Sequence, residues 1–139
     1  SMNQKEDIIE KFYLFGEKIG IAFQIKDDLF DYTPNSFIGK PTGIDIRERK
    51  MTLPLIYTLN IVPKKIKNNI INIVKNHRKD DKKVQEVIKL VKDNGGVQYA
   101  EMKMKEYEKE ALRILKKLPK NESRKSLEML VSYVIKRKK

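Results

Sequence analysis

The sequence of 139 residues contains no cysteine and a single histidine, His77. Without cysteine, neither a disulfide framework nor a thiolate metal site is available, and a lone histidine does not support a nucleophilic triad. No apolar run approaches the roughly 20 residues that span a bilayer, and no signal-peptide pattern opens the chain. These absences predict a cytoplasmic protein without a transmembrane segment, and they leave metal-assisted chemistry through oxygen ligands.

Alternation of polar and apolar residues is absent too, and so is any internal repeat. Apolar residues instead recur at helical spacing, which predicts an all-α fold in one domain over residues 2–139, with Ser1 as a cloning remnant. The first three expected helices run from about Lys5 to Asp31, from Thr52 to about Asn60, and from Pro63 through His77. The fourth runs from Asp80 or Asp81 to Gly95-Gly96, and the fifth runs from there to Pro119. The last helix begins at Asn121 or Ser123 and leads to the basic tail. His77 is expected to pack at the margin of its helix's apolar face.

Acidic residues are in deficit, because 31 Lys and Arg stand against 19 Asp and Glu and give a net charge of +12. Most of the surplus is lysine, spread along the helices after residue 63 on faces opposite the apolar positions. This pattern is typical of a solvated surface, and no groove-reading helix or aromatic RNA-binding signature accompanies it. We therefore expect no nucleic-acid partner. A basic helical nucleic-acid binder stays the alternative, and it requires strongly salt-dependent binding.

An acidic motif stands out against this basic background. Asp27, Asp28 and Asp31 lie on one predicted helix with Gln24, and a step of about 100° per residue gathers the four into one polar stripe. Apolar residues cover most of the remaining circumference between Ile8 and Phe30. The pattern predicts a largely buried helix whose carboxylates point into a cavity.

Clustered carboxylates repel one another and are costly to bury, so a cation is the usual compensation. Oxygen ligands without nearby His or Cys suit Mg²⁺, which takes one or two carboxylates and completes its coordination with water and phosphate oxygens. A solvated acidic face is the other interpretation. The apolar flanks and the Gly/Lys-rich segment after the motif favour the metal site with a phosphate or diphosphate ligand. Gly16 and Gly20 favour it too, because close approach of a neighbouring helix or a ligand would justify their low helix propensity.

Two segments resemble a known family. Residues 20–32, Gly-Ile-Ala-Phe-Gln-Ile-Lys-Asp-Asp-Leu-Phe-Asp-Tyr, and residues 38–56, from Ile-Gly-Lys-Pro-Thr-Gly-Ile-Asp to Thr-Leu-Pro-Leu-Ile, closely resemble the second aspartate-rich motif and following loop of trans-polyprenyl diphosphate synthases. Weaker similarity continues through Gly95-Gly96 and residues 123–128 to the basic tail. The resemblance implies the C-terminal part of the isoprenoid synthase fold, a bundle of helices around a deep cavity.

The family's reaction implies roles for the motif. An allylic diphosphate ionises with the help of Mg²⁺, isopentenyl diphosphate adds to the carbocation, and the chain grows by one isoprene unit. By resemblance, Asp27, Asp28 and Asp31 hold Mg²⁺ against the departing diphosphate. Lys40 contacts that diphosphate directly, which makes Asp27, Asp28 and Lys40 the implied catalytic residues.

Further positions are implied to bind substrate. Gln24 lines the cavity near the allylic group. Asp45 contacts the residues that bind metal and diphosphate, without binding either directly, and Lys50 adds positive charge nearby. Arg137, in the basic tail, resembles a segment that closes over isopentenyl diphosphate in some members.

The chain also departs from the family pattern, because nothing in it resembles the first aspartate-rich motif. We therefore expect a C-terminal fragment of a prenyltransferase that is inactive alone, and whose exposed apolar surface drives homo-oligomer formation. The alternative is a non-catalytic subunit or interaction module of a prenyl synthase complex.

Overall fold

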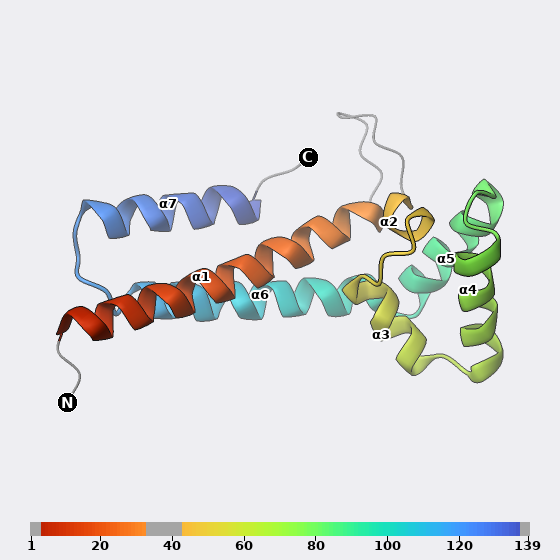
Figure 1. The fold of residues 1–139 in the computed structure, drawn as a ribbon, viewed down its shortest axis with the longest axis horizontal. Helices are drawn as coiled ribbons and strands as arrows, with labels where there is room; N and C mark the ends of the chain where they lie inside the picture. Colours follow the sequence, from red (N-terminus) through yellow and green to blue (C-terminus); the bar gives the residue numbers. More distant parts are fainter. Residues whose placement is uncertain (1–3, 33–42, 137–139) are drawn as a thin grey trace. The chain divides into compact units, whose positions relative to one another are not determined.

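The structure, a computed structural model, describes residues 4–32 and 43–136. Within those ranges it is helical and contains no strand (Figure 1), which confirms the all-α prediction. The helices are α1 (Gln4–Leu29), the 3₁₀ turn η1 (Phe30–Tyr32), α2 (Ile44–Arg47), α3 (Leu53–Ile61), α4 (Lys64–Asn76), α5 (Asp81–Asp93), α6 (Gly96–Leu115) and α7 (Glu122–Lys136). None of the described helices has both the length and the apolar character needed to cross a membrane.

Several helix ends follow the residues that sequence reasoning selected. Asp80 caps α5, since its side chain accepts hydrogen bonds from the amides of Lys82 and Lys83, and the aspartate also suits the positive end of the helix dipole. Gly95, at φ +82°, occupies the left-handed conformation between α5 and α6. Thr52, where a helix was expected to begin, stands at the N-cap of α3, but its side chain makes no capping bond.

Contacts divide the described residues into two compact units. The first unit contains residues 4–26 and 103–136, and the second contains residues 27–32 and 43–102. The prediction of a single domain over residues 2–139 stays a prediction.

The second unit has a continuous apolar core formed by η1, α2 and the packed helices α3, α4 and α5. Its fully buried side chains include Tyr32, Ile46, Leu55, Ile70, Ile73, Val84, Val87 and Val91. Burying an aliphatic side chain of this size stabilises the folded chain by about 1.5–3 kcal/mol. The start of α6 joins this core through Tyr99, whose ring stacks on that of Tyr57 in α3 with centroids 4.2 Å apart.

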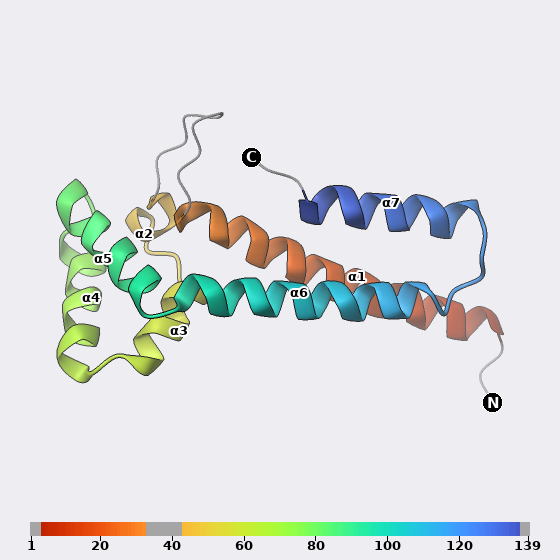
Figure 2. The same cartoon turned by 180° about the vertical axis from the view of Figure 1, so that it is seen from behind.

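The first unit consists of most of α1, most of α6, and α7. In both views, α1 and α6 run side by side (Figures 1 and 2). Lys18 of α1 joins them, because its Nζ lies 3.2 Å from Glu110 Oε2 and 5.4 Å from the centroid of the Tyr107 ring. Buried side chains of this unit include Phe15, Ala22, Ile25, Met104, Ala111 and Leu115.

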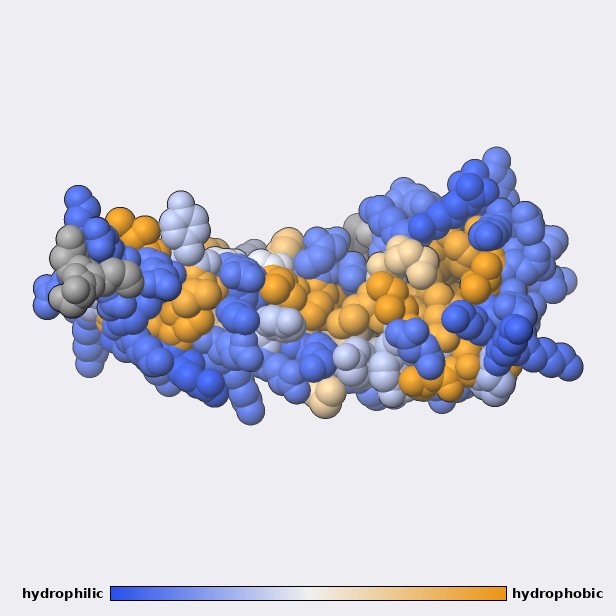
Figure 3. Space-filling view, turned by 60° about the horizontal axis from the view of Figure 1, so that its bottom comes forward, coloured by the Kyte–Doolittle hydropathy of each residue, from blue (hydrophilic) through white to orange (hydrophobic). Residues whose placement is uncertain are grey.

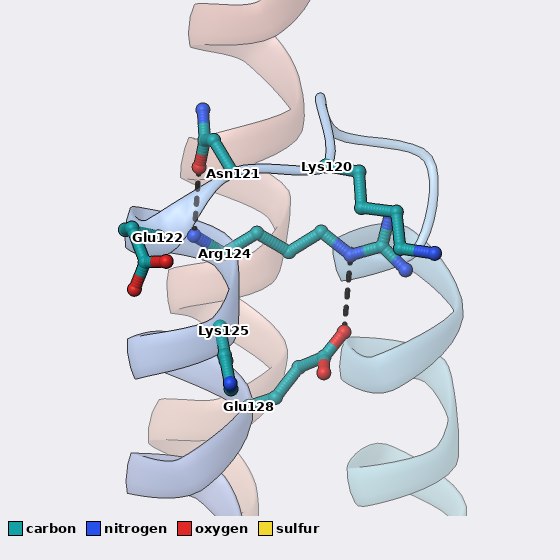
Figure 4. A pocket seen from close by; sticks show the side chains of 6 residues that line it. All are labelled: Lys120, Asn121, Glu122, Arg124, Lys125 and Glu128. Atoms are coloured by element: carbon teal, nitrogen blue, oxygen red, sulfur yellow. Dashed lines mark hydrogen bonds and ion pairs between the residues drawn. The ribbon is translucent and has the colours of Figure 1, made fainter.

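The connection from α6 to α7 is held by polar contacts around Arg124 (Figure 4). Its backbone amide donates to Asn121 Oδ1 at 3.0 Å, which makes Asn121 the N-cap of α7. Its guanidinium donates to Glu128 Oε1 at 3.0 Å and to the carbonyl of Leu118 at 3.3 Å. A polar hollow of about 640 Å³ beside these side chains is therefore built around a structural contact network.

Two predictions about buried residues are wrong. In α1, Phe15, Ala22, Ile25 and Leu29 are buried, but Phe12 is 42% exposed and Phe23 is also exposed, so the helix is not largely buried. The described chain contains too few helices to surround α1 on all sides. His77 does not pack on a helix face either: it is exposed at the C-cap of α4, where the helix ends.

Candidate functional site

Asp27 and Asp28 lie in the last turn of α1 and are half-buried. Asp28 Oδ2 accepts a hydrogen bond from the amide of Leu53 at 3.4 Å. Leu53 is the first residue of α3, where backbone amides have no partner within the helix and the helix dipole favours negative charge. The motif is therefore connected to the α3 terminus through Asp28.

Asp31 points into the second unit and is 3% exposed. Its Oδ1 accepts a hydrogen bond from the amide of Asp45 at 3.1 Å, and its backbone carbonyl accepts one from the amide of Gly43 at 3.0 Å. Both partners lie at the start of α2, where Gly43 is the N-cap and Asp45 belongs to the first turn. Asp31 thus ties the acidic motif to α2.

The electrostatics of Asp31 reflect its burial. Loss of hydration raises the pKa of its carboxyl, and hydrogen bonds from backbone amides, Asp45 first, partly oppose that rise. Asp31 Oδ2 is buried and accepts no hydrogen bond from the residues that the structure describes. A buried carboxylate oxygen without a donor is costly, so a cation beside it would stabilise the ionised form.

Asp45 brings a lysine to the same place. Lys50 Nζ lies 3.6 Å from Asp45 Oδ1 and 3.3 Å from Glu48 Oε2. The hydrogen bond to Glu48 is the main cause of the raised pKa of Lys50, and the charge of Asp45 adds to it. The Lys50 side chain is mostly exposed, so it places a positive charge at the surface next to Asp45.

Tyr32 and Thr52 are structural residues of the site that sequence reasoning did not identify. The Tyr32 hydroxyl is buried and lies 3.3 Å from Thr52 Oγ1. Burial raises the pKa of Tyr32, and the hydrogen bond to Thr52 counteracts this in part. The contact connects the end of the motif to the start of α3, across a separation in sequence that helical periodicity cannot reveal.

Comparison with known proteins identifies the family. The model of the family described as "Polyprenyl synthetase" matches residues 1–91, which is more than half of the chain. The chain belongs to the polyprenyl synthetase family. The resemblance inferred from the motif is thereby confirmed.

Individual family members agree with this assignment. The chain is 31% identical over 132 residues to solanesyl diphosphate synthase 1 of Arabidopsis thaliana. The structure matches geranylgeranyl pyrophosphate synthetase from Pyrococcus horikoshii Ot3 with a TM-score of 0.86 and 34% identity over 98% of this chain. It also matches geranylgeranyl pyrophosphate synthase from Corynebacterium glutamicum, solved with calcium and isoprenyl diphosphate, with a TM-score of 0.75 and 31% identity over 93% of this chain.

The chain spans a minor part of each relative's length. It covers 31% of the Arabidopsis enzyme, 41% of the Pyrococcus chain and 40% of the Corynebacterium chain. The predicted fold class, part of the isoprenoid synthase fold, is confirmed. The activity of a complete synthase is not thereby assigned to these residues.

The carboxylates of this family member suit a magnesium ion in their donor chemistry. Asp27 and Asp28 supply oxygen atoms at adjacent helix positions, and Asp31 adds the buried Oδ2, which has no hydrogen-bond partner within residues 4–32 and 43–136. No three His, Cys, Asp or Glu side chains of the described residues form a group that could hold a metal ion by themselves. Mg²⁺ needs only one or two carboxylates when water and phosphate oxygens complete its coordination, so the residues fit the ion together with a diphosphate.

The predicted site residues fall into two groups. Gln24, Asp27, Asp28, Asp31, Asp45 and Lys50 lie within the described residues, whereas Lys40 and Arg137 lie outside them. The structure brings Asp31, Asp45 and Lys50 together, and it leaves Gln24 exposed on α1. The functional roles assigned to all of these residues by resemblance stay predictions.

Proposed function

We propose that these residues supply the second aspartate-rich motif of a magnesium-dependent prenyltransferase that joins isopentenyl diphosphate to an allylic diphosphate. The buried Asp31 Oδ2 carries this proposal, because no described residue donates a hydrogen bond to it and a cation would stabilise a buried ionised oxygen at that position. The calcium and isoprenyl diphosphate bound to the Corynebacterium relative support it.

The chain's own residues would act on the diphosphate in distinct ways. Asp27 and Asp28 would hold the metal, and Asp31 would fix Gly43 and Asp45 beside the motif while its Oδ2 offers a further oxygen ligand. Lys50 would add positive charge near the leaving group, with Asp45 fixing its position. When bound, Mg²⁺ supplies Lewis-acid stabilisation of the charge that develops on the departing diphosphate.

Calorimetric titration of the purified chain with geranyl diphosphate tests this assignment. We expect binding that requires Mg²⁺ and that weakens about tenfold or more in Asp27→Asn, equivalent to about 1.4 kcal/mol. Asp93→Asn is the matched control, because it removes the same charge from an exposed position at the end of α5. We also expect no prenyl product from this chain with both diphosphates and Mg²⁺.

Two results would contradict these expectations separately. Binding of equal strength without Mg²⁺, or in Asp27→Asn, would refute the metal motif and favour a non-catalytic interaction module. Steady product formation would leave the motif in place and refute the proposed inactivity of the chain by itself.

An exposed face of α1 supports a second part of the proposal, that this unit pairs with another helical surface. Ile9, Phe12, Gly16, Gly20 and Phe23 recur at spacings of three and four residues and therefore share one side of the helix. Ile9, Phe12 and Phe23 are exposed, and a Cβ added at either glycine would meet nothing within 4 Å. A second copy of the chain could approach closely there.

Sedimentation velocity measures this association. We expect the wild-type chain to sediment as a dimer or larger species at micromolar concentration, because exposed apolar surface of this kind favours association. Phe12→Glu should shift it toward monomer. Tyr133→Glu, on an exposed aromatic residue of α7, should leave the species unchanged, and a monodisperse wild-type monomer would oppose the proposal.

A further inference from the structure

A groove between α3 and α4 lies apart from the acidic motif, within the second unit. It has a volume of about 620 Å³, and Leu55, Ile56 and Leu59 of α3 face Ile70, Ile71 and Val74 of α4 across it. Figure 3 shows hydrophobic side chains gathered at the surface over this part of the chain, toward the right of the view, with hydrophilic ones around them. The volume falls within the range of small-molecule pockets, about 300–1,000 Å³.

Cationic side chains border this apolar groove. Arg49, Lys67 and Lys75 contribute to its lining, and no Asp or Glu of the described residues does. Within residues 4–32 and 43–136, neither Lys67 nor Lys75 forms an ion pair. The Arg49 guanidinium donates to the backbone carbonyl of Lys75 at 3.0 Å, which holds it at the end of α4.

The basic end of the groove continues into a polar hollow. Arg49 and Lys75 also line a space of about 480 Å³ together with Arg78 and Lys79. The carboxylate of that lining, Asp80, accepts hydrogen bonds from backbone amides as the cap of α5. The hydrocarbon-lined groove therefore ends at a concentration of positive charge.

The two halves of this surface suit different parts of one ligand. Met51 is 57% exposed and Ile56 is 38% exposed. Covering such apolar side chains with hydrocarbon in place of water lowers the free energy of the complex. A free phosphate would not use that groove, and a neutral lipid would not use the cations. A single-stranded nucleic acid would require aromatic stacking partners, and no aromatic side chain is among the groove's described lining residues.

We propose that the groove between α3 and α4 binds one molecule of an anionic amphiphile. Its hydrocarbon chain lies between the two helices, and its head, a phosphate or similar anion, lies against Arg49 and Lys75. None of the motif aspartates lines this groove, so the inference does not rest on the proposed prenyltransferase function.

Decyl phosphate below its critical micelle concentration is the probe that tests the ligand class. Calorimetry with the whole chain should give one molecule bound per chain, without Mg²⁺. Butyl phosphate, which keeps the head, and decyl maltoside, which replaces the head with an uncharged one, should each bind at least about tenfold more weakly. Equal binding of all three compounds, or several molecules bound per chain, would overturn the proposal.

Paired variants locate the site. Lys75→Glu should weaken decyl phosphate binding by about tenfold, whereas Lys89→Glu makes the same charge change at an exposed position of α5 and should alter it little. Asp27→Asn should leave binding intact. Equal weakening by the two lysine variants would indicate attraction by net charge alone, and loss of binding in Asp27→Asn would place the ligand at the motif; either outcome overturns the proposal.

A final measurement distinguishes binding to a membrane surface from binding of a single amphiphile molecule. Phosphatidylglycerol vesicles should bind Lys75→Glu and Lys89→Glu equally, because the two variants have the same net charge as each other. Vesicle binding that depends on Lys75 while monomeric decyl phosphate does not bind would assign the groove to a membrane surface instead, and it would refute the single-molecule site. Circular dichroism of each variant shows whether its helices have folded.

Discussion

Replacing Gly96 with alanine should lower the free energy of unfolding by about 2–3 kcal/mol, a typical cost of forcing extra volume into a packed site. A Cβ at this position would lie 2.7 Å from the Pro54 carbonyl oxygen, 2.7 Å from Thr58 Oγ1 and 2.8 Å from Val91 Cγ1. Thr58 already donates to that carbonyl at 2.8 Å, so the backbone of α3 would have to move. Urea denaturation followed by circular dichroism measures the change.

The α1 glycines provide the matched control. Gly20 is exposed, and a Cβ there would meet nothing within 4 Å. Gly20→Ala should therefore stabilise the monomeric chain by up to about 1 kcal/mol, because alanine is the better helix former. If Gly96→Ala proves as stable as Gly20→Ala, the close contact between the start of α6 and α3 is wrong.

These glycines show where sequence reasoning succeeded and where it failed. The pair Gly95-Gly96 correctly indicated the junction of two helices, because a left-handed residue commonly ends a helix. Close approach of a neighbour was instead expected at Gly16 and Gly20. It occurs in the described chain at Gly43 and Gly96, since a glycine's neighbours in space depend on tertiary packing that the sequence around it does not record.

The acidic motif shows the same limit at the site. Helical spacing correctly placed Asp27 and Asp28 near the end of a long helix. Asp31 was expected to continue their stripe, but the chain tightens into a 3₁₀ turn at Phe30–Tyr32, with about three residues per turn instead of 3.6. Asp31 is instead bonded to the amide of Asp45, a contact across the segment that follows the motif, and periodicity carries no information on such contacts.

The helical spacing of the apolar side chains in α1 was predictable from the sequence, but which of them are buried was not. Their spacing predicts a helix that can be covered on nearly all sides, and the first unit covers only part of it. Phe15 and Ala22 are buried while Phe12 and Phe23 are exposed. A sequence therefore predicts which residues can enter a core, whereas actual burial depends on which surfaces are present to cover them.

Replacing Gly43 with alanine should destabilise the chain by about 2–4 kcal/mol, because strain in the left-handed conformation and steric overlap both contribute. Gly43 has φ +83°, and a Cβ there would lie 2.5 Å from Val84 Cγ1 and 3.3 Å from Ile88 Cδ1. Its amide donates to the Asp31 carbonyl at 3.0 Å, so displacing it should also loosen the motif and weaken magnesium-dependent binding of geranyl diphosphate.

Gly95→Ala separates these effects, because Gly95 has nearly the same φ, +82°, with nothing within 4 Å of an added Cβ. It should cost only the conformational strain, about 1–2 kcal/mol, and leave diphosphate affinity unchanged. Urea denaturation and calorimetry on both variants therefore measure steric overlap and motif geometry separately. Equal destabilisation would show that Val84 yields at little cost, and unchanged diphosphate binding in Gly43→Ala would show that the bond from Gly43 to Asp31 does not position the metal ligands.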